Sequence, residues 1–124
     1  MNTRQQGEQG ERAAEEYLVA CGMEPVARNL RYPRGEVDLV MRDGGYTVFV
    51  EVKRRDGARY GTGREAVNLA KRRRICAVAL RYLQANGAVG TPVRFDVVEI
   101  HGGAVTHLPN AFPYTPPARG RGFF

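Results

Sequence analysis

The stretch of sequence that decides the fold spans residues 36–53 and reads EVDLVMRDGGYTVFVEVK. Its two halves are apolar and meet at Gly44-Gly45, and a glycine pair between apolar runs predicts a β-hairpin with a two-residue turn. Such a turn pairs Asp43 with Tyr46 and fixes which side chains of the two strands lie opposite one another.

This register brings acidic and basic side chains together at the open end of the hairpin. It places Asp38 directly opposite Glu51, with Cβ atoms roughly 5 Å apart, where two like charges are destabilising. Side chains alternate between the faces of a strand, so Lys53 shares the face of Glu51, and Glu36 lies opposite Lys53. A divalent cation that bridges both carboxylates would remove the repulsion, so the pattern predicts a metal site with a lysine beside it.

The alternative is a cross-strand ion pair between Glu36 and Lys53, with the two other acids facing water. The interpretation that the two acids face water has an argument against it. Val48 and Val50 make one face of the second strand apolar, while Phe49 adds an apolar residue to the other. A strand that is apolar on both faces is typically central and covered, and acids near its end are costly unless paired or bound to metal. Structural ion pairs produce similar clusters, so both interpretations stay open on these residues alone.

Length and composition restrict the fold class and the compartment. A chain of 124 residues with 43% hydrophobic and 26% charged residues is expected to form one soluble domain. It contains no apolar run near the ~20 residues of a membrane span and no secretory signal, so we expect a cytoplasmic protein without membrane contact. Cys21 and Cys76 lie on apolar helical stripes, and buried, reduced thiols are expected. His101 and His107 lack a partner motif, which argues against a histidine-based catalytic triad.

The charge balance points to an anionic partner. The net charge is +6 and the isoelectric point about 9.8. Nucleic acid is the commonest anionic partner of a basic cytoplasmic protein. Charge alone does not distinguish a nuclease from a module that only binds RNA or DNA.

Periodicity predicts the remaining elements. The expected elements outside the hairpin are helices at 6–21 and 68–86 and strands at 23–31, 93–100 and 104–108. The resulting order of helix, three strands, helix and two strands (α-β-β-β-α-β-β) predicts an α/β domain with a central mixed sheet flanked by helices. Residues 1–112 form this single domain, and the Pro/Gly-rich basic segment 113–124 is expected to be a flexible tail.

Three further charged residues lie at packed surfaces. Glu11 is only about 20° from Leu18 on a helical wheel, so it points toward whatever the first helix covers. Lys71 lies on the apolar stripe of the second helix, four residues before Ile75, and either extends to solvent or pairs with an acid of the sheet. Asp96 is more typical of a structural partner for a buried Arg or Lys than of a metal ligand.

Taken in order, these residues resemble a known superfamily. The helix glutamate Glu11, the strand acid Asp38 and the segment Glu51-Val52-Lys53 resemble the PD-(D/E)XK nucleases, in particular their archaeal Holliday-junction resolvase branch. A closer similarity, to the YraN-type family of small bacterial proteins, covers about residues 7–112. Its segments are Gly10-Glu11 with Ala14 and Tyr17-Leu18, GEVDL at 35–39, FVEVKR at 49–54, Lys71, RFDVV at 94–98 and NAF at 110–112.

The resemblance implies a restriction-endonuclease-like domain with a metal-dependent active site. By position, Asp38 and Glu51 would coordinate Mg²⁺ or Mn²⁺. The backbone carbonyl of Val52 would be a third ligand, and Glu11 would complete or flank the set. Lys53 would orient or help deprotonate the attacking water. The implied catalytic residues are Glu11, Asp38, Glu51 and Lys53.

One residue departs from the superfamily's pattern, and further candidates follow from their own position and charge. Val37 stands where the superfamily's name has proline, a residue that is often absent in its members. Glu36 and Asp96 are supporting residues, and the candidate nucleic-acid-binding residues are Arg54, Arg55, Arg59, Arg64, Lys71 and Arg73.

The implied function is hydrolysis of nucleic-acid phosphodiesters, with DNA, including branched structures, as the expected substrate and RNA left open. The alternative is a non-catalytic nucleic-acid-binding protein or an assembly subunit that keeps the nuclease fold. A homodimer is also open, because the similar resolvases act as symmetric pairs.

Overall fold

The structure is a computed structural model that describes residues 2–55 and 67–117. Its elements follow the predicted order, which is therefore confirmed. They are α1 (Thr3–Ala20), β1 (Glu24–Tyr32), β2 (Gly35–Asp43), β3 (Tyr46–Arg55), α2 (Leu69–Ala85), β4 (Val93–His101) and β5 (Ala104–Leu108).

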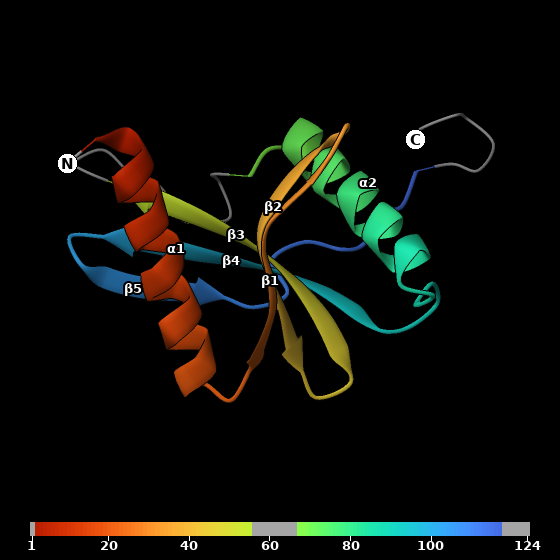
Figure 1. Cartoon of the computed structure of the whole chain (residues 1–124), viewed down its shortest axis with the longest axis horizontal. Coiled ribbons are helices and arrows are strands. Elements are labelled where there is room, and N and C mark those ends of the chain that lie inside the picture. The colour runs from red at the N-terminus through yellow and green to blue at the C-terminus, as the bar shows by residue number, and fades with distance from the viewer. Residues whose placement is uncertain (1, 56–66, 118–124) are drawn as a thin grey trace.

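The strands form one five-stranded mixed sheet in the order β1-β2-β3-β4-β5. Neighbouring strands are antiparallel except for β3 and β4, which are parallel and are joined by the crossover through α2. The two helices lie on opposite sides of the sheet (Figure 1). In β3, the central strand, Val48, Phe49 and Val50 are all buried, so the prediction of a strand covered on both faces is confirmed.

Helix termini follow their capping residues. Asn2 and Gln5 form a capping box that starts α1 at Thr3, one turn before the predicted start. Asn68 caps α2 as predicted, and its side chain accepts a hydrogen bond from the backbone N–H of Lys71. The helices end before Gly22 and Gly87, which take φ values of 101° and 63° that favour glycine.

The two cysteines differ in their environment. Cys76 is buried on α2, as predicted, but the prediction that Cys21 is buried is wrong. Cys21 is the C-cap of α1, beyond the last turn that packs on the sheet, and it is exposed.

Each face of the sheet has its own apolar core. Phe49 and Phe95 belong to the core beneath α2, whereas Leu18 of α1 packs on Leu39 and Met41 in the core on the other face. The second core depends on a close approach by α1. A Cβ atom at Gly10 would lie 3.1 Å from Cδ of Arg54, so a larger residue there would displace the Arg54 side chain.

The hairpin of β2 and β3 has the predicted register near its turn. Asp43 pairs with Tyr46, but the ladder ends where Leu39 pairs with Val50. Beyond that point the backbone N–H of Val52 donates to Oδ2 of Asp38 at 2.7 Å, so a side chain replaces the next ladder partner. The two strands therefore diverge, and the gap between them creates the site described below.

The divergence changes one predicted pair. Beyond Leu39, β2 remains paired with β1, and Glu36 lies opposite Arg31. Nε of Arg31 forms an ion pair with Oε2 of Glu36 at 3.0 Å. The prediction that Glu36 pairs with Lys53 is wrong, because the β2–β3 ladder has already ended.

The C-terminal segment begins by packing against α2. The backbone N–H of Thr115 donates to Sγ of Cys76 at 3.4 Å, and the ring of Tyr114 lies 5.6 Å from that of Phe95. Of the predicted tail, residues 118–124 lie outside the described part of the chain. Within residues 2–55 and 67–117, no helix is long and apolar enough to cross a membrane.

Candidate functional site

The candidate site lies where β2 and β3 separate, beneath the first turn of α2. Asp38 and Glu51 meet there, and Glu51 is only 6% exposed. The two acids line a pocket of about 330 Å³ together with Val52, Lys71 and Arg74. The structure thus brings together the two acids that the hairpin register predicted.

The environment of Asp38 opposes its ionisation. Burial, the hydrogen bond with Glu51 and the negative charge of Glu51 raise the pKa of Asp38 to about 9, against the opposing hydrogen bond from Val52. A hydrogen bond between two carboxyl groups requires that one of them holds a proton. The pair is therefore a costly arrangement for an unliganded protein.

Lys71 of α2 supplies the positive charge that faces Glu51. Its Nζ lies 2.7 Å from Oε2 of Glu51, which confirms one of the two alternatives considered for this lysine. The approach lacks hydrogen-bond geometry, and within the described residues this fully enclosed oxygen has no hydrogen-bond partner. Burial acts to lower the pKa of Lys71, but its contacts with Glu51 and Lys53 outweigh burial and raise it.

Lys53 lies one pleat beyond Glu51 on β3 and contacts Lys71. Burial and then the neighbouring ammonium of Lys71 lower the pKa of Lys53, against the attraction of Glu51 and Asp38. A half-buried lysine of lowered pKa gives up its proton more readily than an exposed one. Lys53 is therefore placed to exchange a proton with a molecule bound beside the acids.

Glu11 lies at the side of this site rather than in it. It lines a neighbouring pocket of about 380 Å³ with Asn29 and Arg31, and Glu36 lines both pockets. Burial raises the pKa of Glu11, Asn29 opposes that rise with a hydrogen bond, and Glu51 adds a weaker repulsion. Asn29 has a φ of 51°, so the backbone of β1 is irregular where it meets Glu11.

Of the two supporting residues, Glu36 lies at the edge of the pocket of the two acids, whereas Asp96 does not line it. Glu36 is exposed and paired with Arg31, at the boundary between the two pockets. Asp96 is 1% exposed and accepts hydrogen bonds from the guanidinium of Arg94 at 2.9 and 3.0 Å and from the backbone of Asn110. Its Oδ2 also lies 2.7 Å from Nε2 of His107. Asp96 is thus the structural partner of a buried arginine, as predicted.

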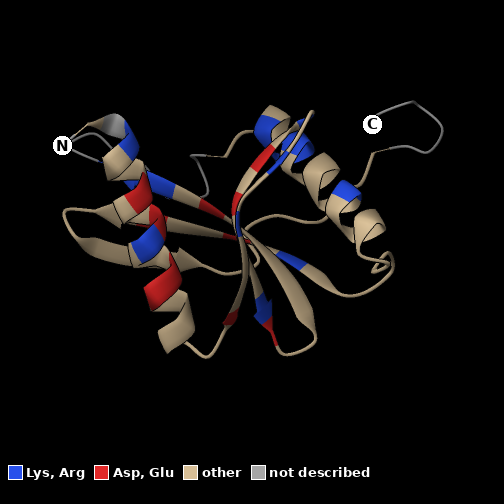
Figure 2. Cartoon of the chain, viewed as in Figure 1, with Lys and Arg blue, Asp and Glu red and all other residues tan. Residues whose placement is uncertain are grey.

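The nucleic-acid-binding candidates that the structure describes lie in different surroundings. Arg54 packs its side chain against Gly10 of α1, whereas Arg55 forms an ion pair with buried Glu99 at 3.4 Å. Lys71 and Arg73 lie on α2. Arg59 and Arg64 lie outside the described residues. Figure 2 shows basic residues concentrated at the N-terminal end of α2, close to the turn between β1 and β2.

Sequence reasoning missed two residues of this region. Arg74 lines the pocket of the two acids, and its position three residues after Lys71 places both on one side of the helix, which the sequence could have revealed. Glu99 lies beside Lys53 in the parallel register of β3 and β4. Glu99 follows Phe95 and Val97 at intervals of two residues, and this spacing was the available signal that all three side chains face the same side of the sheet.

The residues of the site fit a hard divalent cation. Asp38 and Glu51 bring their carboxyl oxygens together, and the enclosed Oε2 of Glu51 faces the ammonium of Lys71 without hydrogen-bond geometry. When both acids are deprotonated, they form the oxygen-rich donor set that Mg²⁺ and Mn²⁺ prefer. In the part of the chain that the structure describes, no group of three or more His, Cys, Asp or Glu side chains could hold a metal. A cation here would therefore be held by Asp38, Glu51 and the backbone carbonyl of Val52, with Glu11 beside this set.

Comparison with known proteins places the chain in a family. The model of the uncharacterised protein family UPF0102 matches residues 10–100, which include every described residue of the site. A UPF0102 protein of Symbiobacterium thermophilum is 52% identical over 82% of this chain and 86% of its own length. UPF0102 proteins of Rhodococcus jostii and Clostridioides difficile are 46% and 36% identical over 86% and 90% of this chain, and over 94% and 100% of their own lengths. This chain belongs to the UPF0102 family.

Proposed function

We propose that this chain is a metal-dependent nuclease that hydrolyses nucleic-acid phosphodiesters, with DNA as its expected substrate and Mg²⁺ or Mn²⁺ as its cofactor. The observation that carries the proposal is the buried pair of Asp38 and Glu51, which meet with one oxygen of Glu51 lacking a hydrogen bond. A divalent cation would stabilise this pair by replacing the proton that the two acids share, in competition with the ammonium of Lys71. The net charge of +6 suits an anionic substrate.

The chemistry divides among the chain's own residues. A divalent cation held by the acids would stabilise charge on the attacked phosphate and lower the pKa of bound water. Lys53, whose pKa is lowered, would accept the proton of the attacking water, while Lys71 would place an ammonium beside the phosphate oxygens. Arg74, at the edge of the pocket, would hold a neighbouring phosphate of the strand.

One contact favours the alternative of a non-catalytic nucleic-acid-binding protein. The ammonium of Lys71 lies 2.7 Å from Glu51 and already supplies a positive charge to the acid that a metal would need. If this ion pair is permanent, the site needs no cation. The protein would then bind nucleic acid without cleaving it.

A cleavage assay tests the proposal. The purified protein is incubated with Mg²⁺ or Mn²⁺ and with single-stranded, linear duplex and branched DNA and RNA. We expect cleavage by the wild type and a loss on the order of a hundredfold or more in Asp38→Asn and Glu51→Gln, because each change removes a charged ligand. Asp43→Asn, at the far end of the same hairpin, is the matched control and should cut normally.

Binding measured on the same variants separates the two functions. A protein that leaves every substrate intact, and whose salt-sensitive binding survives or strengthens in Asp38→Ala, is a binding protein. Loss of cleavage in Asp43→Asn equal to that in Glu51→Gln would contradict the assignment of the site.

A further inference from the structure

A second pocket lies next to the site of the two acids, on the outer side of α2. It has a volume of about 530 Å³ and is enclosed by three separate segments of the chain. The turn between β1 and β2 contributes Pro33 and Arg34, α2 contributes Arg73, Arg74 and Ala77, and residues 115–117 form the third side. Arg74 lines this pocket as well as the pocket of Asp38 and Glu51, so the two are adjacent.

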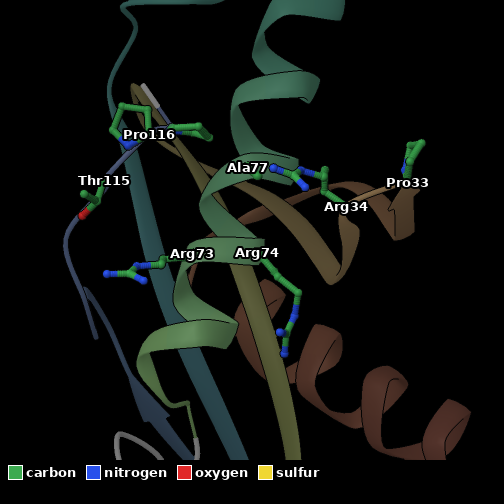
Figure 3. Close-up of a pocket in the computed structure, with 8 residues that line it drawn as sticks. Pro33, Arg34, Arg73, Arg74, Ala77, Thr115 and Pro116 are labelled. Atoms are coloured by element: carbon green, nitrogen blue, oxygen red, sulfur yellow. The ribbon is translucent and has the colours of Figure 1, made fainter. Parts of the chain in front are cut away.

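The lining combines positive charge with apolar surface. Figure 3 shows the guanidinium group of Arg34 directed toward α2 at Ala77, with Pro116 and Thr115 on the other side of the helix. Arg73 extends toward the side of Thr115, whereas Arg74 extends away from it. The small side chain of Ala77 leaves room between these groups, and the proline rings give flat, apolar walls.

We propose that this pocket binds an unpaired nucleotide of the nucleic-acid substrate, next to the phosphate that lies at Asp38 and Glu51. This inference rests on the proposed function and adds a substrate class, namely nucleic acid with single-stranded or frayed nucleotides beside the cleavage point. The guanidinium groups bind phosphates, and the base packs against Ala77 and the prolines.

The chemistry of the pocket lining favours an unpaired nucleotide over a fully paired duplex. A paired duplex presents phosphates and sugars at its outer surface, so charged side chains suffice to hold it. An unpaired base exposes an apolar face that proteins bind on flat side chains or guanidinium planes. A pocket that offers both kinds of surface, and that shares Arg74 with the pocket of the two acids, matches a nucleotide whose base is free.

The spacing of the arginines supports a strand rather than a single anion. Arg73 and Arg74 are consecutive on α2 and point in different directions, while Arg34 reaches the pocket from another element. Three guanidinium groups that diverge cannot all bind one phosphate. They can hold successive phosphates of a strand that crosses the helix toward Glu51.

Equilibrium binding to DNA hairpins tests the inference without any cleavage. The probes are a blunt hairpin and the same hairpin with a short single-stranded overhang that contains 2-aminopurine, both in EDTA. The test variant is Arg34→Ala/Arg73→Ala, whose two side chains are exposed, and the matched control is Arg12→Ala/Arg42→Ala, which removes the same charge from two exposed positions elsewhere.

We expect the test variant to lose about tenfold or more in affinity for the overhang hairpin and to abolish the 2-aminopurine fluorescence change, because phosphate contacts and base packing are both removed. Affinity for the blunt hairpin should fall no further than in the control variant. Equal losses for the two probes, or equal losses in the two variants, would overturn the inference.

The proposed function fails on different measurements. Absence of Mn²⁺ binding and of cleavage by the wild type would contradict the nuclease, whatever the hairpins show. Cleavage by the wild type that Arg34→Ala/Arg73→Ala retains, with unchanged preference for the overhang, would contradict the nucleotide pocket alone.

Discussion

Asp96 and Glu51 are buried acids on neighbouring strands of one sheet, and the partners of their carboxyl oxygens differ. Both oxygens of Asp96 accept hydrogen bonds, from Arg94 and from the backbone of Asn110, and His107 adds a further contact. Glu51 instead meets Asp38, and one of its oxygens has no hydrogen bond within the described residues.

A buried carboxylate with every oxygen satisfied strengthens the fold, because each partner would be left unpaired by its loss. A buried acid that is held against a second acid must share a proton or gain a positive partner, here Lys71, so it adds less to the stability of the fold. The difference predicts opposite responses to mutation at Asp96 and at Asp38.

The largest effect is expected at Asp96, the acid whose two oxygens both accept hydrogen bonds. Asp96→Ala should reduce the free energy of unfolding by about 3–5 kcal/mol, because it removes the main partner of the Arg94 guanidinium, whose side chain is only 17% exposed. Urea denaturation measures the change. Asp43→Ala is the control: its side chain is 40% exposed and accepts one hydrogen bond from Arg94, so a loss of about 1 kcal/mol is expected. Similar losses of stability in both variants would contradict the special contribution of Asp96 to the fold.

The next effect is stabilisation of the wild type by a cation. At a Mn²⁺ concentration one hundred times its Kd, the free energy of unfolding should rise by about 2.7 kcal/mol. Glu51→Gln should respond little, because it lacks a charged ligand. Thermal denaturation across a Mn²⁺ titration measures both proteins. An equal response of Glu51→Gln would mean that the cation binds elsewhere.

A smaller effect, of opposite sign to that at Asp96, is expected when Asp38 is replaced by a residue that cannot ionise. Without divalent cations, Asp38→Asn should be about 0.5–2 kcal/mol more stable than the wild type. An Asn side chain can still accept the hydrogen bond from Val52. Since the pKa of Asp38 is raised from 3.8 to about 9, the folded state disfavours its ionisation, and the gain should grow as the pH rises from about 4 toward 9. Thermal melts in EDTA over this pH range measure the gain in stability. A variant less stable than the wild type would contradict the claim that ionisation of Asp38 beside Glu51 destabilises the folded state.

The smallest effect is expected at a surface ion pair that involves neither Asp96 nor Glu51. Arg28 donates to both oxygens of Glu15, and this hydrogen bond lowers the pKa of Glu15. The side chain of Arg28 is 65% exposed, so Glu15→Gln should cost about 1 kcal/mol or less at neutral pH. A lowered pKa gives stability that is present above the unfolded value of 4.5 and is lost as the pH falls through the folded value. The stability difference between wild type and variant, measured by urea denaturation at several pH values, should therefore disappear in acid; a difference that persists there would exclude the ion pair as its cause.

Much of the fold could be predicted because it depends on local patterns. The glycine pair at 44–45 fixes the pairing of Asp43 with Tyr46, and Asn68 with Gly87 sets the limits of α2. The apolar residues on both faces of β3 place it at the centre of the sheet. These signals need only neighbouring residues, so the sequence contains them in full.

The site was predicted in part. Asp38 and Glu51 meet as the register requires, and Lys53 lies beside them, because all three belong to one hairpin. Glu11 lies in a neighbouring pocket, since the position of α1 across the sheet depends on the packing of its apolar residues against the strands, which no local pattern specifies.

By itself, the sequence determined the order of the elements, the central position of β3 and the meeting of two acids, because side-chain periodicity and turn chemistry act over a few residues. Only the tertiary structure decided that β2 leaves β3 at Leu39 and that Glu36 pairs with Arg31, since both outcomes depend on competition between β1 and β3 for the same strand. It also decided that Lys71 faces Glu51 and that Arg34 lies beside Arg74, because these contacts join segments brought together by helix packing on the finished sheet.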